Sequence, residues 1–171
     1  MLILVSGGAA SGKSEYAESL LSDTIHKKIY IATMQPFGED SAVKIARHHA
    51  LRSGKGFQTV ERYTNLAELD IPENCAVLLE CMSNLVANEC FSEAGFEDAI
   101  QRILRGIAHV SECAAEFVVV TNEIFSDGET YDRETAEYIG VLAKANRELA
   151  SRADSVIEVV CGIPVFGKEA V

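Results

Sequence analysis

A glycine-rich segment near the start of the chain has the residue types and spacing of a phosphate-binding loop. Residues 7–14 read G-G-A-A-S-G-K-S and directly follow the apolar run of residues 2–5. The glycines allow backbone conformations in which consecutive N–H groups converge on a polyphosphate. In this pattern Lys13 reaches the β- and γ-phosphates as a catalytic group, and the Ser14 hydroxyl ligates Mg²⁺. The predicted nucleotide-binding residues of this loop are Gly7, Gly8, Ala9, Ala10, Ser11, Gly12, Lys13 and Ser14.

Two glutamates follow apolar runs that are typical of buried parallel strands. Glu80 ends the run of residues 75–80, and Glu123 follows the run of residues 117–121. The carboxyl ends of parallel strands share one edge of the sheet, so we expect both carboxylates near the phosphate loop. An acid at such a strand end can hold Mg²⁺ through water, and we assign this role to Glu80, together with Ser14. The structural alternative is that either glutamate caps a helix.

Two adjacent histidines, His48 and His49, lie in a polar segment that we expect to be helical, residues 39–53. A neutral imidazole nitrogen can attack phosphorus and form a covalent phosphoramidate. The residue types by themselves favour the other interpretation, two solvated surface histidines. The pair therefore has two open interpretations at this point, a nucleophile and a surface feature.

Strands and helices alternate along the whole chain. Strands are expected at residues 2–5, 28–33, 57–60, 75–80, 117–121 and 155–160, and helices at residues 15–21, 39–53, 82–89, 96–113 and 134–152. Residues 64–69 are expected to form a helical turn, and residues 124–133 a loop that could act as a lid. This order predicts an α/β fold of the P-loop NTPase-like (RecA-like) class, with a mainly parallel sheet, helices on both faces and ligands at the carboxyl edge.

The composition limits the classes of function. The chain has 171 residues, 48% of them hydrophobic and 24% charged, which predicts one domain spanning residues 1–171. A net charge of −11 argues against a nucleic-acid partner. No apolar run of 18 residues occurs, so we expect no membrane span and a cytoplasmic protein. Five dispersed cysteines, without a C-x-x-C pair, are interpreted as buried thiols in a reducing compartment: Cys75, Cys81, Cys90, Cys113 and Cys161.

Seven short segments, in their order along the chain, resemble one known family. They are GGAASGKS at 7–14, YIAT at 30–33, KIARHH at 44–49, TVE at 59–61, LLEC at 78–81, VTNE at 120–123 and CGIPV at 161–165. Together they are similar to adenosylcobinamide kinase / adenosylcobinamide-phosphate guanylyltransferase. The resemblance spans nearly the whole chain.

The resemblance implies a bifunctional enzyme of cobalamin assembly. Such an enzyme phosphorylates adenosylcobinamide with ATP or GTP, and then transfers GMP from GTP to the product through a guanylyl-histidine. The family's nucleophile aligns with His48, while His49 occupies the place of a basic residue. Thr33, Glu61 and Glu80 fall in matching segments as nucleotide-binding residues, as does Glu123 with a less defined role. Mg²⁺, a corrinoid substrate and a homo-oligomer, with a trimer as the expected form, are also implied.

The sequence departs from the family pattern in four places, two of which are residues 82–85, where the family usually has L-T-L-W, and residues 146–147, which keep only the Asn of the family's N-Q pair. Ala10 stands where the family usually has an arginine, and residues 125–130 lack the family's usual G-x-G-I-V-P segment. Two other hypotheses therefore stay open. One is a P-loop kinase for a different small molecule. The other is a nucleotide-binding protein without catalytic activity.

Overall fold

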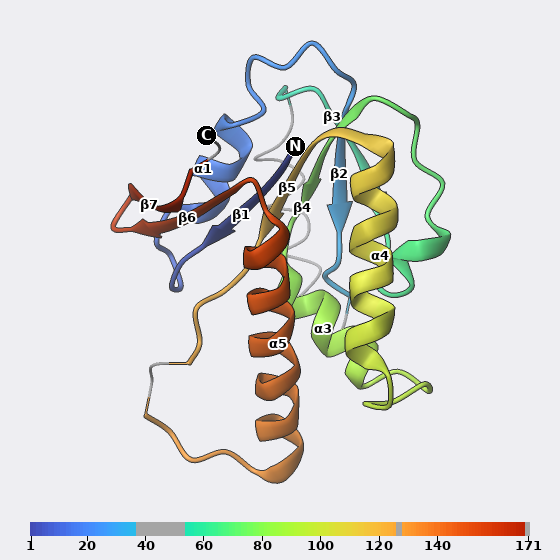
Figure 1. Cartoon of the computed structure of the whole chain (residues 1–171), viewed down its shortest axis with the longest axis vertical. Helices are drawn as coiled ribbons and strands as arrows, with labels where there is room; N and C mark the ends of the chain where they lie inside the picture. Colours follow the sequence, from blue (N-terminus) through green and yellow to red (C-terminus); the bar gives the residue numbers. More distant parts are fainter. Residues whose placement is uncertain (37–53, 126–127, 170–171) are drawn as a thin grey trace.

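The backbone forms a seven-stranded sheet in the order β3-β2-β4-β5-β1-β6-β7 (Figure 1). The computed structural model describes residues 1–36, 54–125 and 128–169. Within them, β1 to β6 run parallel and β7 pairs antiparallel with β6. The strands are β1 Leu2–Ser6, β2 Lys28–Ala32, β3 Phe57–Glu61, β4 Cys75–Leu79, β5 Ala114–Val120, β6 Ser155–Val160 and β7 Ile163–Lys168.

Helices cover both faces of this sheet. They are α1 Lys13–Ser19, α3 Met82–Cys90, α4 Ala99–Cys113 and α5 Arg133–Arg152, with a 3₁₀ turn at Leu66–Glu68. Figure 1 shows α1 on one face and α3, α4 and α5 on the other. Two separate apolar clusters lie between the helices and the sheet, one under α1 and one under the other three helices. The α/β P-loop NTPase-like fold predicted from the sequence is thereby confirmed.

The elements form where local pattern and burial agree. All five residues of β4 are buried, as expected for a central strand between helical layers. Helix α4 buries Ile103, Ile107 and Val110, which lie three and four residues apart on one face. Helix α5 begins after Asp132, whose side chain accepts a hydrogen bond from the Thr135 N–H at 2.9 Å.

The observed structure differs from the sequence predictions in several respects, among them the start of β5 at Ala114 instead of residue 117 and the bounds of α1, Lys13–Ser19 instead of residues 15–21. Strand β7 was not predicted, because Pro164 and Gly167 interrupt its pattern; an edge strand tolerates such residues, since its outer side needs no partner. Helix α4 begins at Ala99 instead of residue 96. The interpretation of all five cysteines as buried thiols was wrong for Cys161, which is exposed, while Cys81 and Cys113 are partly exposed.

No helix among the described residues combines the length and the apolar character needed to cross a bilayer.

Candidate active site

The predicted phosphate-binding loop connects β1 to α1 in a tightly turned conformation. Gly12 has φ +89° and Ala10 has φ +55°, so two loop residues lie in the left-handed region. The Ser11 N–H donates to the Gly8 carbonyl at 3.3 Å, and the Tyr16 N–H donates to the Gly12 carbonyl at 3.0 Å. No side chain caps the first turn of α1. The sequence pattern and the backbone therefore agree on a loop whose amide groups can hold phosphate oxygens.

Lys13 lies over this loop. Its Nζ donates to the Gly8 carbonyl oxygen at 3.0 Å. Burial lowers the pKa of Lys13, and the nearby Cys81 thiol acts in the opposite direction. The ammonium thus lies between the loop and the end of β4. From here it can exchange a neutral carbonyl acceptor for a charged phosphate oxygen, which forms a stronger hydrogen bond.

The β6–β7 hairpin supports the loop from behind. The Gly162 N–H donates to the Ser11 carbonyl at 2.8 Å. A side chain at Gly7 would place its Cβ 2.7 Å from the Val159 carbonyl oxygen. The turn between the strands has positive φ at both Cys161 and Gly162, at 50° and 79°. The closing CGIPV segment therefore contributes directly to the shape of the loop, a role that its residue types alone do not reveal.

The two strand-end glutamates lie at different distances along the carboxyl edge. Glu123 follows β5, which is adjacent to β1, and its N–H donates to the Gly7 carbonyl at 3.0 Å. The Glu123 Oε1 accepts the Phe125 N–H at 3.0 Å, so this side chain also supports the loop after β5, where no helix begins among the described residues for it to cap. Glu80 follows β4, which β5 separates from β1. Glu123 is therefore the acid that the fold attaches directly to the phosphate loop.

Thr33 and Glu61 come from the outer half of the sheet. Thr33 is fully buried after β2, and its hydroxyl donates to the Cys81 carbonyl at 2.9 Å. Glu61 is exposed at the end of β3 and accepts a hydrogen bond from the Tyr63 hydroxyl at 2.9 Å. The same carboxylate and, above all, burial raise the pKa of Tyr63. These two residues lie at the same edge as the loop but three and four strands away in the sheet order.

His48 and His49 lie outside the residues that the structure describes. The assignment of His48 as nucleophile therefore stays a prediction from the sequence.

Several polar residues that the sequence analysis did not single out join the site. Asn122 donates to the Ser83 hydroxyl at 3.2 Å and to the Cys81 sulfur at 3.5 Å, which links the end of β5 to the start of α3. Thr121 donates to the Asn146 side chain of α5 at 2.9 Å. The signal available in the sequence was their position directly after a buried strand.

The two residues predicted to bind Mg²⁺ carry oxygen atoms. Ser14 offers a hydroxyl and Glu80 a carboxylate, the hard donors that this ion prefers. The described residues contain no group of three or more His, Cys, Asp or Glu that could hold a metal ion by themselves. A magnesium ion that arrives with a nucleotide takes most of its ligands from phosphates and water, so two protein oxygens are sufficient.

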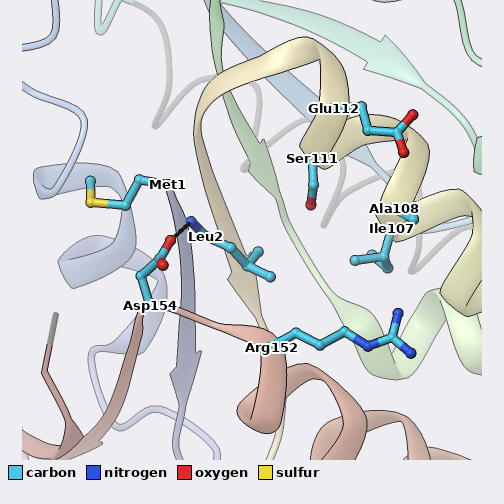
Figure 2. A pocket seen from close by; sticks show the side chains of 8 residues that line it. All are labelled: Met1, Leu2, Ile107, Ala108, Ser111, Glu112, Arg152 and Asp154. Atoms are coloured by element: carbon cyan, nitrogen blue, oxygen red, sulfur yellow. Dashed lines mark hydrogen bonds between the residues drawn. The ribbon is translucent and has the colours of Figure 1, made fainter.

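A cavity also lies at the opposite, amino-terminal edge of the sheet (Figure 2). There the Asp154 carboxylate accepts the Leu2 N–H at 2.7 Å. The lining residues are Met1, Leu2, Ile107, Ala108, Ser111, Glu112, Arg152 and Asp154. None of the predicted site residues is among them, so the candidate site remains the carboxyl edge around the loop.

Comparison with known proteins gives a full-length match to one family. The family model described as cobinamide kinase / cobinamide phosphate guanyltransferase matches residues 3–166. The chain is 36% identical to the bifunctional adenosylcobalamin biosynthesis protein CobU of Escherichia coli (strain K12), covering 96% of this chain and 98% of that protein. It is 34% identical to CobU of Salmonella typhimurium, with the same coverage. A solved structure from Pyrococcus horikoshii OT3 is similar in fold, with a TM-score of 0.52 and 6% identity over 99% of this chain and 87% of that one.

Proposed function

Because the chain belongs to the cobinamide kinase / cobinamide phosphate guanyltransferase family, we propose that one phosphate-binding loop serves both reactions of this bifunctional enzyme. The observation that carries the proposal is the loop itself. Gly7 and Gly12 lie against the β6–β7 hairpin, and the Lys13 ammonium donates to the Gly8 carbonyl. The substrates under this proposal are ATP or GTP and a corrinoid, adenosylcobinamide.

In the kinase step, the loop amides and Lys13 hold the triphosphate while the cobinamide hydroxyl attacks the γ-phosphorus. The bond between the γ-phosphorus and the β,γ-bridging oxygen breaks, and the hydroxyl proton leaves to a base. Glu123 is attached to the loop through the Gly7 carbonyl and is the candidate for this base, because Glu80, two strands away, is assigned to the metal. Ser14 and Glu80 are the residues that would hold Mg²⁺, which would supply positive charge to the transferring phosphoryl group.

In the guanylyltransferase step, an imidazole nitrogen of His48 attacks the α-phosphorus of GTP. The bond to the leaving pyrophosphate breaks, and the loop amides and Lys13 stabilise the charge that develops on it. A phosphate oxygen of adenosylcobinamide phosphate then attacks the same phosphorus. The P–N bond breaks, adenosylcobinamide-GDP forms, and the imidazole is free again.

Intact-protein mass spectrometry after incubation with Mg-GTP tests this proposal. Wild-type protein and His49→Ala are expected to gain a GMP adduct of about 345 Da, and His48→Ala is expected to gain none. Loss of the adduct in His49→Ala but not in His48→Ala would identify His49 as the nucleophile instead of His48. Wild-type protein that binds nucleotide without an adduct would contradict the guanylyl-histidine and favour a plain kinase or a non-catalytic binder.

The proposal also includes a homo-oligomer, with a trimer as the expected form. An exposed apolar surface on the β6–β7 hairpin supports it, formed by Val160, Ile163, Val165 and Phe166. Their exposed fractions range from 47% to 65%, and among the strands that the structure describes β7 lies at the edge of the sheet and pairs only with β6. Light scattering on the purified protein measures the number of subunits in the oligomer.

The proposal places the protein in the cytoplasm. The five free cysteines support this reducing compartment.

A further inference from the structure

Three aromatic side chains meet where helix α3 ends. Phe91 directly follows the last residue of α3, and its ring lies edge-on to that of Phe96, with the ring centres 5.3 Å apart. The ring centre of Tyr138, from α5, lies 6.3 Å from that of Phe91. Phe96 and Tyr138 pack partly buried against the core under α3, α4 and α5, whereas Phe91 is 58% exposed. The three rings therefore form an open apolar surface over the core, which we call the aromatic platform.

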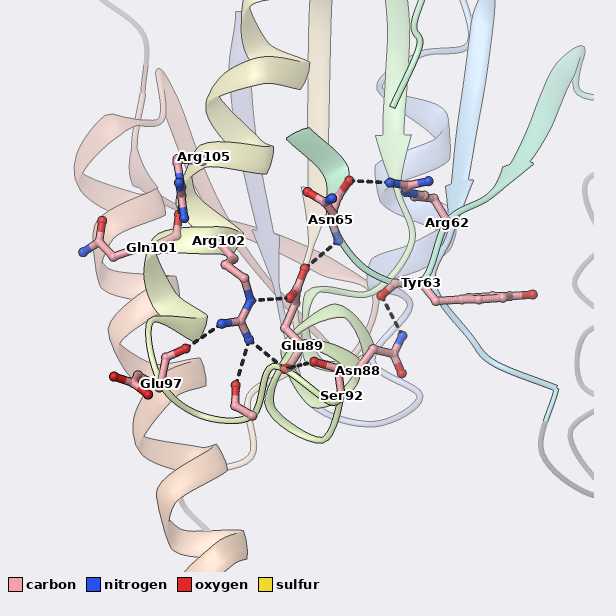
Figure 3. Close-up of polar contacts among 11 residues, drawn as sticks. Arg62, Tyr63, Asn65, Asn88, Glu89, Ser92, Glu97, Gln101, Arg102 and Arg105 are labelled. Carbon is pink, nitrogen blue, oxygen red and sulfur yellow. Dashed lines mark hydrogen bonds and ion pairs between the residues drawn. The ribbon is translucent and has the colours of Figure 1, made fainter. Parts of the chain in front are cut away.

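The connection between α3 and α4, which carries two of these rings, is held by one arginine. Arg102 of α4 donates to the backbone carbonyls of Gly95 and Glu97 within this connection. The same guanidinium donates to the Glu89 carbonyl, and its Nε lies 2.9 Å from the Glu89 carboxylate (Figure 3). A planar guanidinium that holds several acceptors fixes their relative positions. The rings are thus held in place before a ligand binds, which lowers the free-energy cost of ordering this surface on binding.

The aromatic platform is connected to the candidate active site by side-chain hydrogen bonds. The Tyr138 hydroxyl donates to the Ser83 carbonyl at 3.3 Å, and the Ser83 hydroxyl accepts a hydrogen bond from Asn122 at 3.2 Å. Asn122 precedes Glu123, whose N–H donates to the Gly7 carbonyl of the phosphate loop. Figure 1 shows α3 and the first turns of α5 at the end of the molecule towards which β2 points. The platform and the phosphate loop therefore lie at the same edge of the sheet.

The surroundings of the aromatic platform are acidic. Burial is the main cause that raises the pKa of the Cys90 thiol to about 11, and the Glu137 carboxylate acts in the same direction. The negative charge of Glu137 therefore lies near the residue that precedes Phe91. Residues 91–98 and 132–138 contain one arginine, Arg133, so the net charge of these two segments is negative. Their further exposed carboxylates include Glu93, Glu97, Asp98 and Glu134.

We propose that the aromatic platform binds the corrin ring of adenosylcobinamide. This inference rests on the proposed function, which supplies the substrate. The ring and the bases of its side chains are largely hydrocarbon, and the alkylated cobalt(III) centre gives the molecule a net positive charge. Aromatic side chains provide a large contact area for such a ring, and the acidic surroundings attract the cation.

The position of the aromatic platform fits the reaction that this substrate undergoes. The hydroxyl that is phosphorylated lies at the end of a side chain of the corrin, away from the ring. This hydroxyl has to reach the phosphate loop, so the ring itself lies beside the nucleotide site. The platform occupies such a place, because Tyr138, Ser83 and Asn122 connect it to the strand end next to the loop.

Phe91→Ala tests the inference, because it removes the most exposed ring of the aromatic platform. Ile25→Ala is the matched control, since Ile25 is 95% exposed and precedes β2 at the opposite, amino-terminal edge of the sheet. Glu137→Gln removes one of the surrounding charges at nearly constant size. For each protein, equilibrium dialysis with adenosylcobinamide measures the Kd of the corrinoid. Titration with a fluorescent GTP analogue measures nucleotide binding, and light scattering measures the number of subunits.

Phe91→Ala is expected to raise the Kd for adenosylcobinamide about tenfold, because the contact with one aromatic ring is lost. Glu137→Gln is expected to raise this Kd about twofold to threefold and to weaken its dependence on salt. Both variants should bind the GTP analogue as the wild-type protein does. Ile25→Ala should match the wild-type protein in both affinities.

An unchanged Kd in Phe91→Ala, or equal losses in Phe91→Ala and Ile25→Ala, would overturn the inference. A changed number of subunits in Phe91→Ala would also overturn it, because the aromatic platform would then be a contact between copies of this chain. If the wild-type protein binds the GTP analogue but not adenosylcobinamide, the proposed function itself fails, and the inference falls with it.

Discussion

Replacing Gly7 by alanine should distort the phosphate loop from within. The new Cβ would lie 2.5 Å from Ser11 Oγ and 2.7 Å from the Val159 carbonyl oxygen. The serine hydroxyl can rotate away. The carbonyl cannot, because β6 pairs with β1 on one side and with β7 on the other. An ordinary contact begins near 3.4 Å, so the loop or the strand must move by about 0.7 Å.

Overpacking of this kind typically costs about 1–3 kcal/mol in the free energy of unfolding. The same displacement moves the loop amides relative to a bound phosphate. Since a hydrogen bond to a charged group contributes about 1.5–3 kcal/mol, the loss of one such bond should weaken nucleotide binding at least about tenfold. Urea denaturation measures the first quantity for Gly7→Ala, and titration with a fluorescent GTP analogue measures the second.

Gly8→Ala is the matched control in the same loop. A Cβ at Gly8 meets no atom within 4 Å, so stability should stay within about 0.5 kcal/mol of wild type. Two outcomes would refute the reasoning. Gly7→Ala could prove as stable as wild type and bind nucleotide equally well, or Gly8→Ala could prove as damaging as Gly7→Ala. Either result would mean that the hairpin does not define the shape of the loop.

Two further predictions concern local backbone strain and pH. Ala10→Gly should raise the free energy of unfolding by up to about 1 kcal/mol in urea denaturation, because Ala10 has φ +55°, a conformation that costs an L-residue energy and glycine little; a loss of stability would contradict this. Burial raises the pKa of the Cys90 thiol from 9.0 to about 11, and the unfolded chain releases this proton first. Stability should therefore be complete below about pH 9 and fall as the pH rises towards about 11, with a flatter pH dependence in Cys90→Ala.

The phosphate loop was predictable because its function depends on local chain geometry. Glycine spacing, the preceding apolar run and the Lys13-Ser14 pair all lie within 13 residues of one another, and the loop folds as this pattern indicates. Strand β4 was equally clear, because a strand covered on both faces is apolar throughout, and in β5 the same holds for the buried residues 117–120, the part of this strand that was predicted.

The partners of that loop were not predictable, because they depend on pairing between distant segments. Strand β7 and its turn at Cys161 and Gly162 carry the contact to Ser11, and no periodicity in residues 163–168 marks them as a strand. The sequence placed Glu80 and Glu123 at the same edge. Only the strand order shows that β5 lies between β4 and β1 and attaches Glu123 to the loop.

The sequence by itself therefore determined the fold class, the phosphate loop and the family, since these depend on short-range patterns of residue type and on the order of segments along the chain. The tertiary structure decided which residues meet around that loop. The hairpin behind Gly7 and the side-chain hydrogen bonds from Asn88 of α3 to the Thr33 and Tyr63 carbonyls join residues that are 25 or more positions apart. Their proximity is fixed by strand order and helix packing, which no local pattern specifies.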